Sequence, residues 1–227
     1  MAARFCITPD VLNALNEAGL NEPLKRALKG LQGQEFDEER EFLSALYALD
    51  PPPSSEREAA AILRRADTVY LSAIDLLGAA YRAQMNGKLD EAERLYLRSI
   101  EAFPTAEAHT FLGWTYSFAE RYEEAIAQCR LAIEVDPDFG NPYNDIGAYL
   151  IAQDKPGEAI PWLKRATEAA RYEPRHFPWA NLGRVYEMLG NSDRALEHYA
   201  KALEIEPTYR PASDGLERLM GPRNRLN

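Results

Sequence analysis

The stretch LGWTYSFAERYEEAIAQCRLAIEVDP, residues 112–137, recurs further along the chain in other letters. Residues 182–207 read LGRVYEMLGNSDRALEHYAKALEIEP, with Leu-Gly, Tyr, Ala and Pro at the same places. The residues that recur are small or apolar, while the polar residues between them change. A catalytic motif would keep its polar residues and occur once, so the recurrence indicates a rule of packing.

Four turn signals along the chain each end on an alanine. These alanines are Ala92, Ala125, Ala159 and Ala195, at intervals of 33, 34 and 36 residues. A large residue follows each alanine four positions on, and a small one comes three positions later, which puts all three on one face of a helix. A period of this length is typical of stacked helical repeats.

An earlier helix in each unit carries a small residue of its own. These residues are Ala80, Gly113, Gly147 and Gly183. A glycine inside a helix costs about 0.5–1 kcal/mol relative to alanine, so we expect another part of the chain to approach closely there. Proline closes three of the four units and ends their second helices. The third unit has Arg171 instead, and its second helix is expected to overrun until just before Pro174.

These residues resemble the tetratricopeptide repeat family, whose skeleton is W-x2-L-G-x2-Y, then A-x3-F-x2-A, then P. The fourth unit supplies Trp179, Leu182, Gly183, Tyr186, Ala195, Tyr199, Ala202 and Pro207. The third unit is looser, and in the first unit Ala79, Ala80 and Ala83 replace Leu, Gly and Tyr. Four units in phase span roughly residues 73–207.

The resemblance implies an all-α fold, a right-handed α-solenoid of stacked antiparallel helix pairs. Repeats are expected at 73–105, 106–139, 140–175 and 176–209, followed by a capping helix and tail at 210–227. Residues 1–35 predict an N-terminal helical extension. Residues 36–72 form either a degenerate fifth repeat or part of one long helix from about Ser55 to Met85.

The resemblance also implies that the first helix of each pair lines a concave side. When the small residue is taken as position 8, positions 2, 5, 9, 12 and 13 lie on a separate face from the helix–helix core. Large apolar residues there predict an interaction surface, unless residues 1–50 of the same chain cover it. The predicted peptide-binding groove, here named the inner stripe, consists of Leu77, Tyr81, Met85, Thr110, Trp114, Phe118, Asn144, Phe177, Arg184, Glu187 and Met188.

We therefore expect a non-enzymatic protein–protein interaction module or adaptor that binds an extended or helical peptide segment in this groove. Its partner should be apolar or amphipathic, with a basic residue to meet Glu107 or Glu187. The alternative is a self-associating scaffold that pairs with another copy through its N-terminal helices or repeat faces. The carboxylate clamp known in this family is not expected, because only Asn144 and Arg184 could join it.

Composition disfavours a nucleic-acid-binding protein, a membrane protein and a secreted protein. A net charge of −10 disfavours nucleic acid as a partner, because that binding depends on basic residues. No apolar run approaches the roughly 20 residues of a membrane span, and Pro9 and Asp10 precede any signal-like stretch. We expect a soluble, cytoplasmic protein whose two cysteines, Cys6 and Cys129, stay free thiols.

No catalytic residue, cofactor site or metal site is predicted. The three histidines are scattered, and with the cysteines they make no zinc spacing. His109 occupies a packing position, His198 falls inside a second helix, and Cys129 stands at the large core position as a compact hydrophobe. The phosphate-binding and dinucleotide-binding glycine motifs are absent from the sequence.

Overall fold

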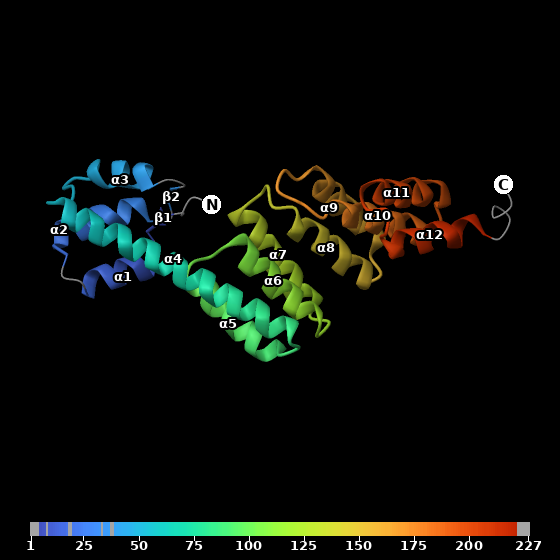
Figure 1. The fold of residues 1–227 in the computed structure, drawn as a ribbon, viewed down its shortest axis with the longest axis horizontal. Helices are drawn as coiled ribbons and strands as arrows, with labels where there is room; N and C mark the ends of the chain where they lie inside the picture. Colours follow the sequence, from blue (N-terminus) through green and yellow to red (C-terminus); the bar gives the residue numbers. More distant parts are fainter. Residues whose placement is uncertain (1–4, 8, 18–19, 33, 37–38, 222–227) are drawn as a thin grey trace. The chain divides into compact units, whose positions relative to one another are not determined.

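The structure is a computed structural model that describes residues 5–221 apart from 8, 18–19, 33 and 37–38. It divides into two compact units, residues 1–104 and residues 105–227 (Figure 1). Almost all regular structure in both units is helical. A pair of two-residue strands in the first unit is the exception to the expected all-α class.

The first unit joins segments that the sequence analysis separated, namely residues 1–35, residues 36–72 and nearly all of residues 73–105. In chain order it contains β1 (Phe5–Cys6), α1 (Pro9–Glu17), α2 (Glu22–Leu28), η1 (Lys29–Leu31), β2 (Glu35–Phe36), α3 (Glu39–Tyr47), α4 (Glu56–Met85) and α5 (Leu89–Ala102). β1 pairs antiparallel with β2, and the Phe5 ring stacks on Phe42 of α3 with 5.3 Å between centroids. Leu28 of α2 and Ile62 of α4 are buried in the same core. The expected division at residue 36 therefore falls inside β2 and inside one continuous core.

Helix α4 runs without a break from Glu56 to Met85. It contains no proline, and Leu71 stands where a closing proline would end a repeat. The expected boundary at residues 72–73 therefore lies inside a helix, and the long helix from about Ser55 is what forms. Its first half buries Ala59 and Ala66 in the N-terminal part of the unit, while its second half pairs with α5.

The second unit is a row of helix pairs. It contains α6 (Ala106–Ser117), α7 (Tyr122–Val135), α8 (Asn141–Ala152), α9 (Pro156–Glu168), α10 (His176–Met188), α11 (Ser192–Ile205) and α12 (Arg210–Met220). Each first helix packs against the second helix that follows it, and α12 packs on α11 (Figure 1). This arrangement confirms the α-solenoid of stacked helix pairs with a capping helix. Residues 222–227 of the expected tail lie outside the described residues.

The glycines of the first helices stand where a neighbouring helix comes too close for a side chain. A Cβ atom on Gly147 would lie 2.4 Å from Leu163 Cδ2 of α9. A Cβ atom on Gly183 would lie 2.6 Å from the Tyr199 ring of α11. Gly215 of α12 approaches the opposite edge of the same ring, where a Cβ atom would lie 2.5 Å from Cε2. The close approach inferred from the sequence is therefore present at these positions.

The expected overrun of the third repeat's second helix is wrong. Helix α9 ends at Glu168, and the chain after it turns back along the loop that precedes α8. The Arg171 amide donates to the Asp138 carbonyl at 3.0 Å, and the Gly140 amide donates to the Arg171 carbonyl at 3.0 Å. The guanidinium of Arg175 also donates to the Ala169 carbonyl at 3.1 Å. These bonds satisfy backbone groups that an extra helical turn would otherwise satisfy.

We predict that Gly183→Ala lowers the free energy of unfolding by about 1–3 kcal/mol, the usual cost of overpacking a core. The Tyr199 ring cannot move away from the new methyl group, because Gly215 of α12 lies against its other edge. Thermal and urea unfolding followed by circular dichroism would measure the change.

The matched control is Gly157→Ala in the first turn of α9, where nothing lies within 4 Å of a Cβ atom. This variant should be neutral or slightly stabilising, because alanine favours the helix. Equal effects of the two substitutions would contradict the packing role of Gly183.

Candidate functional site

The first unit carries three residues of the inner stripe on the last turns of α4. Leu77 is half-buried, whereas Tyr81 and Met85 keep 41 % and 59 % of their surface exposed. The N-terminal segment packs on Ile62 and Ala66, nearer the start of α4. Within this unit, the described residues of the segment 5–49 therefore leave Tyr81 and Met85 exposed.

In the second unit the inner stripe has two exposed clusters. At the end of α6, the ring of the half-buried Trp114 lies 5.5 Å from that of Phe118, the residue after the helix, which is 54 % exposed. On α10, Phe177, Arg184 and Met188 are exposed. These five side chains project from positions that the helix–helix core leaves free, so they remain candidates for contact with a partner.

Two residues of the inner stripe are buried instead. The Thr110 side chain is 1 % exposed, and its hydroxyl donates to the Ala106 carbonyl at 2.7 Å. The Asn144 side chain is 8 % exposed, and its Oδ1 accepts from Asn181 Nδ2 of the next first helix at 3.0 Å. The residues at position 5 of these two repeats are thus covered by the protein itself. The spacing of the small residues did not reveal this burial.

The acidic residues expected to meet a basic partner are already paired within the chain. Glu107 accepts from the Arg171 guanidinium at 2.6 Å, and Arg171 also bridges to Asp136 at 2.6 Å. Glu187 accepts two bonds from Arg218 of α12, at 2.7 and 2.9 Å. The Arg218 guanidinium accordingly holds the pKa of the Glu187 carboxyl below its usual range.

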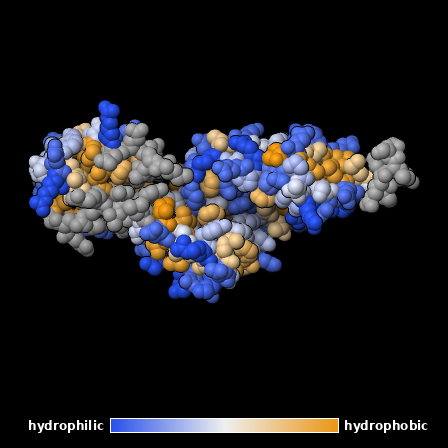
Figure 2. Space-filling model, in the orientation of Figure 1, coloured by the Kyte–Doolittle hydropathy of each residue, from blue (hydrophilic) through white to orange (hydrophobic). Residues whose placement is uncertain are grey.

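The structure adds an aromatic cluster to the inner stripe that the sequence analysis missed. The Tyr209 ring lies 5.4 Å from Phe177 and 4.7 Å from His176. Tyr209 precedes α12, whose Leu219 is half-buried and whose Met220 is exposed. Figure 2 shows hydrophobic residues reaching the surface among hydrophilic ones over α10–α12. Gly215 occupies position 8 of α12, as Gly183 does in α10. Extending the repeat pattern to α12 could therefore have predicted that the apolar surface continues there.

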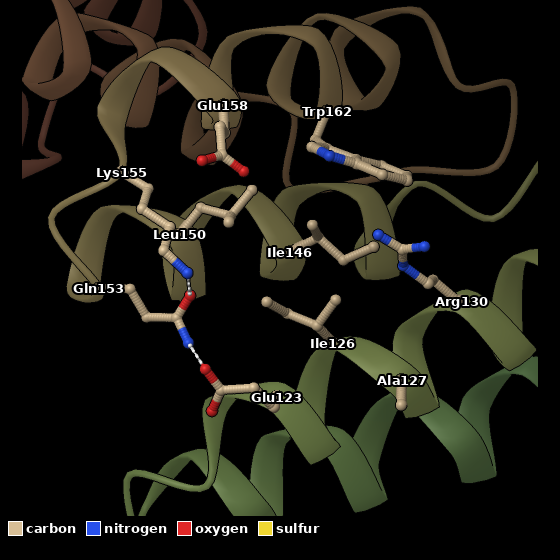
Figure 3. Close-up of a pocket in the computed structure, with 10 residues that line it drawn as sticks. All are labelled: Glu123, Ile126, Ala127, Arg130, Ile146, Leu150, Gln153, Lys155, Glu158 and Trp162. Atoms are coloured by element: carbon tan, nitrogen blue, oxygen red, sulfur yellow. Dashed lines mark hydrogen bonds between the residues drawn. The ribbon is translucent and has the colours of Figure 1, made fainter.

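A separate cleft of about 430 Å³ opens between α7, α8 and α9. Figure 3 shows its apolar side chains and its polar end, where Gln153 donates to Glu123 at 2.7 Å and accepts from Lys155 at 3.0 Å. Because these polar groups bond to one another, they present no convergent set of reactive groups. Its apolar lining consists of Ile126, Ala127, Ile146, Leu150 and Trp162.

The histidine and cysteine side chains of the repeats pack against other side chains in the structure. The His109 ring nitrogen Nδ1 lies 2.8 Å from the Gln128 amide oxygen, and burial lowers its pKa. His198 is stacked between Trp179 and Tyr186, with centroid distances of 5.6 and 5.1 Å. Burial raises the pKa of the Cys129 thiol well above its ordinary value, which keeps the thiol protonated.

No group of three or more His, Cys, Asp or Glu side chains in the described part of the chain could hold a metal ion. No helix among the same residues is long and apolar enough to cross a membrane.

Asp145 of α8 is the unusual titratable group of the second unit. Burial raises the pKa of its carboxyl to about 7, whereas an exposed aspartate titrates near about 3.9. The folded protein therefore binds this proton more tightly than the unfolded chain does. Stability from this residue is greatest below about pH 4, falls as the pH rises, and levels off above about pH 7.

We predict that Asp145→Asn removes this fall, because an amide keeps the shape without the charge. The melting temperature of the variant should exceed that of the wild type increasingly between about pH 5 and pH 8, by about 2–4 °C per kcal/mol regained. Asp214→Asn on the exposed face of α12 is the control. Parallel melting curves for the two variants at every pH would contradict the burial of an unpaired charge at Asp145.

Comparisons with known proteins agree with the repeat geometry. Models of the tetratricopeptide repeat match residues 106–139 and residues 138–207. Human tetratricopeptide repeat protein 29 is 33 % identical over 105 residues, which cover 44 % of this chain and 22 % of that protein. Protein bimA of Emericella nidulans is 26 % identical over 103 residues, which cover 45 % of this chain and 12 % of that one. The chain thus spans about a fifth or less of these relatives.

Solved structures resemble the fold over a larger share. The crystal structure of MamA is 26 % identical, with a TM-score of 0.54, and the match covers 62 % of this chain and 81 % of that one. PilF of Pseudomonas aeruginosa matches with a TM-score of 0.64 at 20 % identity, over 67 % of this chain and 69 % of PilF. At this identity the match supports only a similarity of fold. With the interlocked helix pairs, the repeat models show that residues 106–207 are built from tetratricopeptide repeats, a fold that is a general protein–protein interaction module.

Proposed function

We propose that the protein is a non-enzymatic adaptor that binds an extended or helical apolar segment along the inner stripe of its second unit. The observation that carries the proposal is the exposure of large apolar side chains on or directly after the first helices α6 and α10. Phe118 is 54 % exposed, Met188 41 % and Phe177 36 %. Water contact with such a cluster is unfavourable, and a partner that covers it gains about 25 cal/mol for each Å² of apolar surface.

The aromatic residues suit a binding role for a second reason. Trp114 and Phe118 already contact each other at one end of the unit, as Phe177 and Tyr209 do towards the other. Rings held by a neighbouring ring lose little conformational entropy when a partner covers them. Aromatic residues of this kind carry much of the energy in many interfaces.

Selection from a random nonapeptide library, followed by fluorescence polarisation with the enriched peptides, tests the proposal. Trp114→Ala, Phe118→Ala and Met188→Ala should each weaken binding at least tenfold, because truncated anchors cost about 2 kcal/mol or more. Leu131→Ala is the control, since Leu131 is 40 % exposed but lies on the second helix α7.

Three outcomes decide between the hypotheses. Selective loss in the inner-stripe variants supports the proposal. Unchanged affinity in all three, or equal loss with Leu131→Ala, contradicts it. Light scattering on the same samples tests the alternative scaffold, because a monomer at every concentration is inconsistent with pairing of two copies.

A further inference from the structure

Asp145 of α8 has no basic partner among the described residues, in contrast to Glu107 and Glu187. Glu107 and Glu187 accept from arginines at 2.6 and 2.7 Å. Among the described residues, Asp145 pairs with no basic side chain, and the Asn144 amide donates to its Oδ1 at only 3.4 Å. Its side chain is partly exposed. A carboxylate withdrawn from bulk water without a countercharge is costly, so such groups normally have a partner.

A second polar group on the same helix face is also unsatisfied. Tyr149 follows Asp145 by one helical turn, which places the two side chains on one face of α8. Tyr149 is 6 % exposed, and within the described part of the chain its hydroxyl makes no hydrogen bond. Leaving a buried hydroxyl without a partner costs about 1–3 kcal/mol. Among the described residues, the Tyr149 hydroxyl therefore has no hydrogen-bond partner, and the Asp145 carboxyl has only the long bond from Asn144.

No Lys or Arg among the described residues forms an ion pair with Asp145 or a hydrogen bond with the Tyr149 hydroxyl. The groups that act on the Asp145 carboxyl or respond to it are Cys129 of α7, Asn144 and Tyr149 of α8, and Tyr172 of the loop after α9. Burial raises the pKa of the Cys129 thiol and of both phenols, so all three stay neutral. The field around Asp145 thus favours a cation from outside the chain.

The pair lies beside the inner stripe. Ser117 of α6, whose hydroxyl donates to the Trp114 carbonyl at 2.8 Å, lies near the Tyr149 hydroxyl. Ala148 is half-exposed between Asp145 and Tyr149 in the sequence of α8, and its small side chain leaves room for a long one to pass. A flexible lysine stem reaches past such a surface while its ammonium group donates to oxygen atoms below.

We propose that Asp145 and the Tyr149 hydroxyl form a subsite for a lysine side chain of the segment bound along the inner stripe. This inference rests on the proposed function and names the chemistry of the partner. The ammonium group donates to a carboxylate oxygen of Asp145 and to the Tyr149 oxygen, and the lysine stem packs beside Trp114. The partner is therefore an apolar segment with one lysine at a fixed distance from its apolar anchors. The basic partner expected from the sequence is retained, but its acceptor moves from Glu107 or Glu187 to Asp145.

The test compares the nonapeptides that a random library yields on the wild type and on Asp145→Asn. The wild type should enrich peptides with a lysine at constant spacing from apolar residues, whereas Asp145→Asn should enrich apolar peptides without that lysine. Asp214→Asn should select as the wild type does. In the most enriched peptide, Lys→Gln should weaken binding to the wild type at least tenfold and to Asp145→Asn less than twofold.

A pH series adds a readout that a merely structural role of Asp145 would not change. The lysine peptide should bind the wild type more tightly as the pH rises through about 7, because the carboxyl then loses its proton while lysine keeps its charge up to about pH 10. The Lys→Gln peptide and the Asp145→Asn protein should show no such rise. Tyr149→Phe should keep the pH dependence and lose part of the affinity.

The outcomes separate this inference from the proposed function. Equal lysine enrichment on the wild type and on Asp145→Asn, with loss of binding in Phe118→Ala, overturns the lysine subsite and leaves the groove intact. No enrichment on the wild type overturns both. A lysine preference that disappears in Asp145→Asn supports the subsite, provided that the variant retains the wild-type circular dichroism spectrum.

Discussion

The ring of Tyr199 lies between two glycines of successive first helices, Gly183 and Gly215, at distances that allow no Cβ atom on either. This interlock fixes how the last helix pair stacks, and Gly147 against Leu163 fixes the pair before it in the same way. Because close-packed side chains have few alternative arrangements, the stack determines which faces of α8, α10 and α12 remain free. The inner stripe is therefore the face of each first helix that remains free after its glycine-bearing face has packed against a second helix.

The free face is more apolar than its sequence suggests, because two arginines neutralise its acids. Arg171 bridges Glu107 and Asp136 while its guanidinium lies 4.2 Å from the centre of the Phe139 ring. Arg218 ties α12 to Glu187, whose other bond comes from the Tyr199 hydroxyl at 2.8 Å. Each arginine thus joins segments that are distant in the chain. A partner meets exposed rings and methionines on this face, together with Arg184.

The sequence predicted what depends on local periodicity, and it failed where distant segments meet. The helix pairs and their close contacts followed from alanine and glycine spacing, because offsets of three and four residues define a helix face. The fold of residues 5–72 did not, since the pairing of β1 with β2 and the burial of Phe42 depend on contacts without a repeat. The Arg171–Glu107 pair spans 64 positions. Burial of Thr110 and Asn144 depends on a neighbouring helix that helix geometry alone does not place.

The surroundings of Asp145 differ from the matching places in other repeats, because the large core residue beside it is a cysteine. In the first and fourth repeats the large core residue is a tyrosine whose hydroxyl donates to position 12, as Tyr96 does to Gln84 at 2.6 Å and Tyr199 to Glu187 at 2.8 Å. The second repeat has the smaller Cys129 there, which has no hydroxyl and fills less space. The Asp145 carboxyl and the Tyr149 hydroxyl of the next helix lie near this thiol. A core that needed only stability would fill this space with apolar atoms, so the retained carboxyl and hydroxyl are better explained by a donor that arrives from outside the chain.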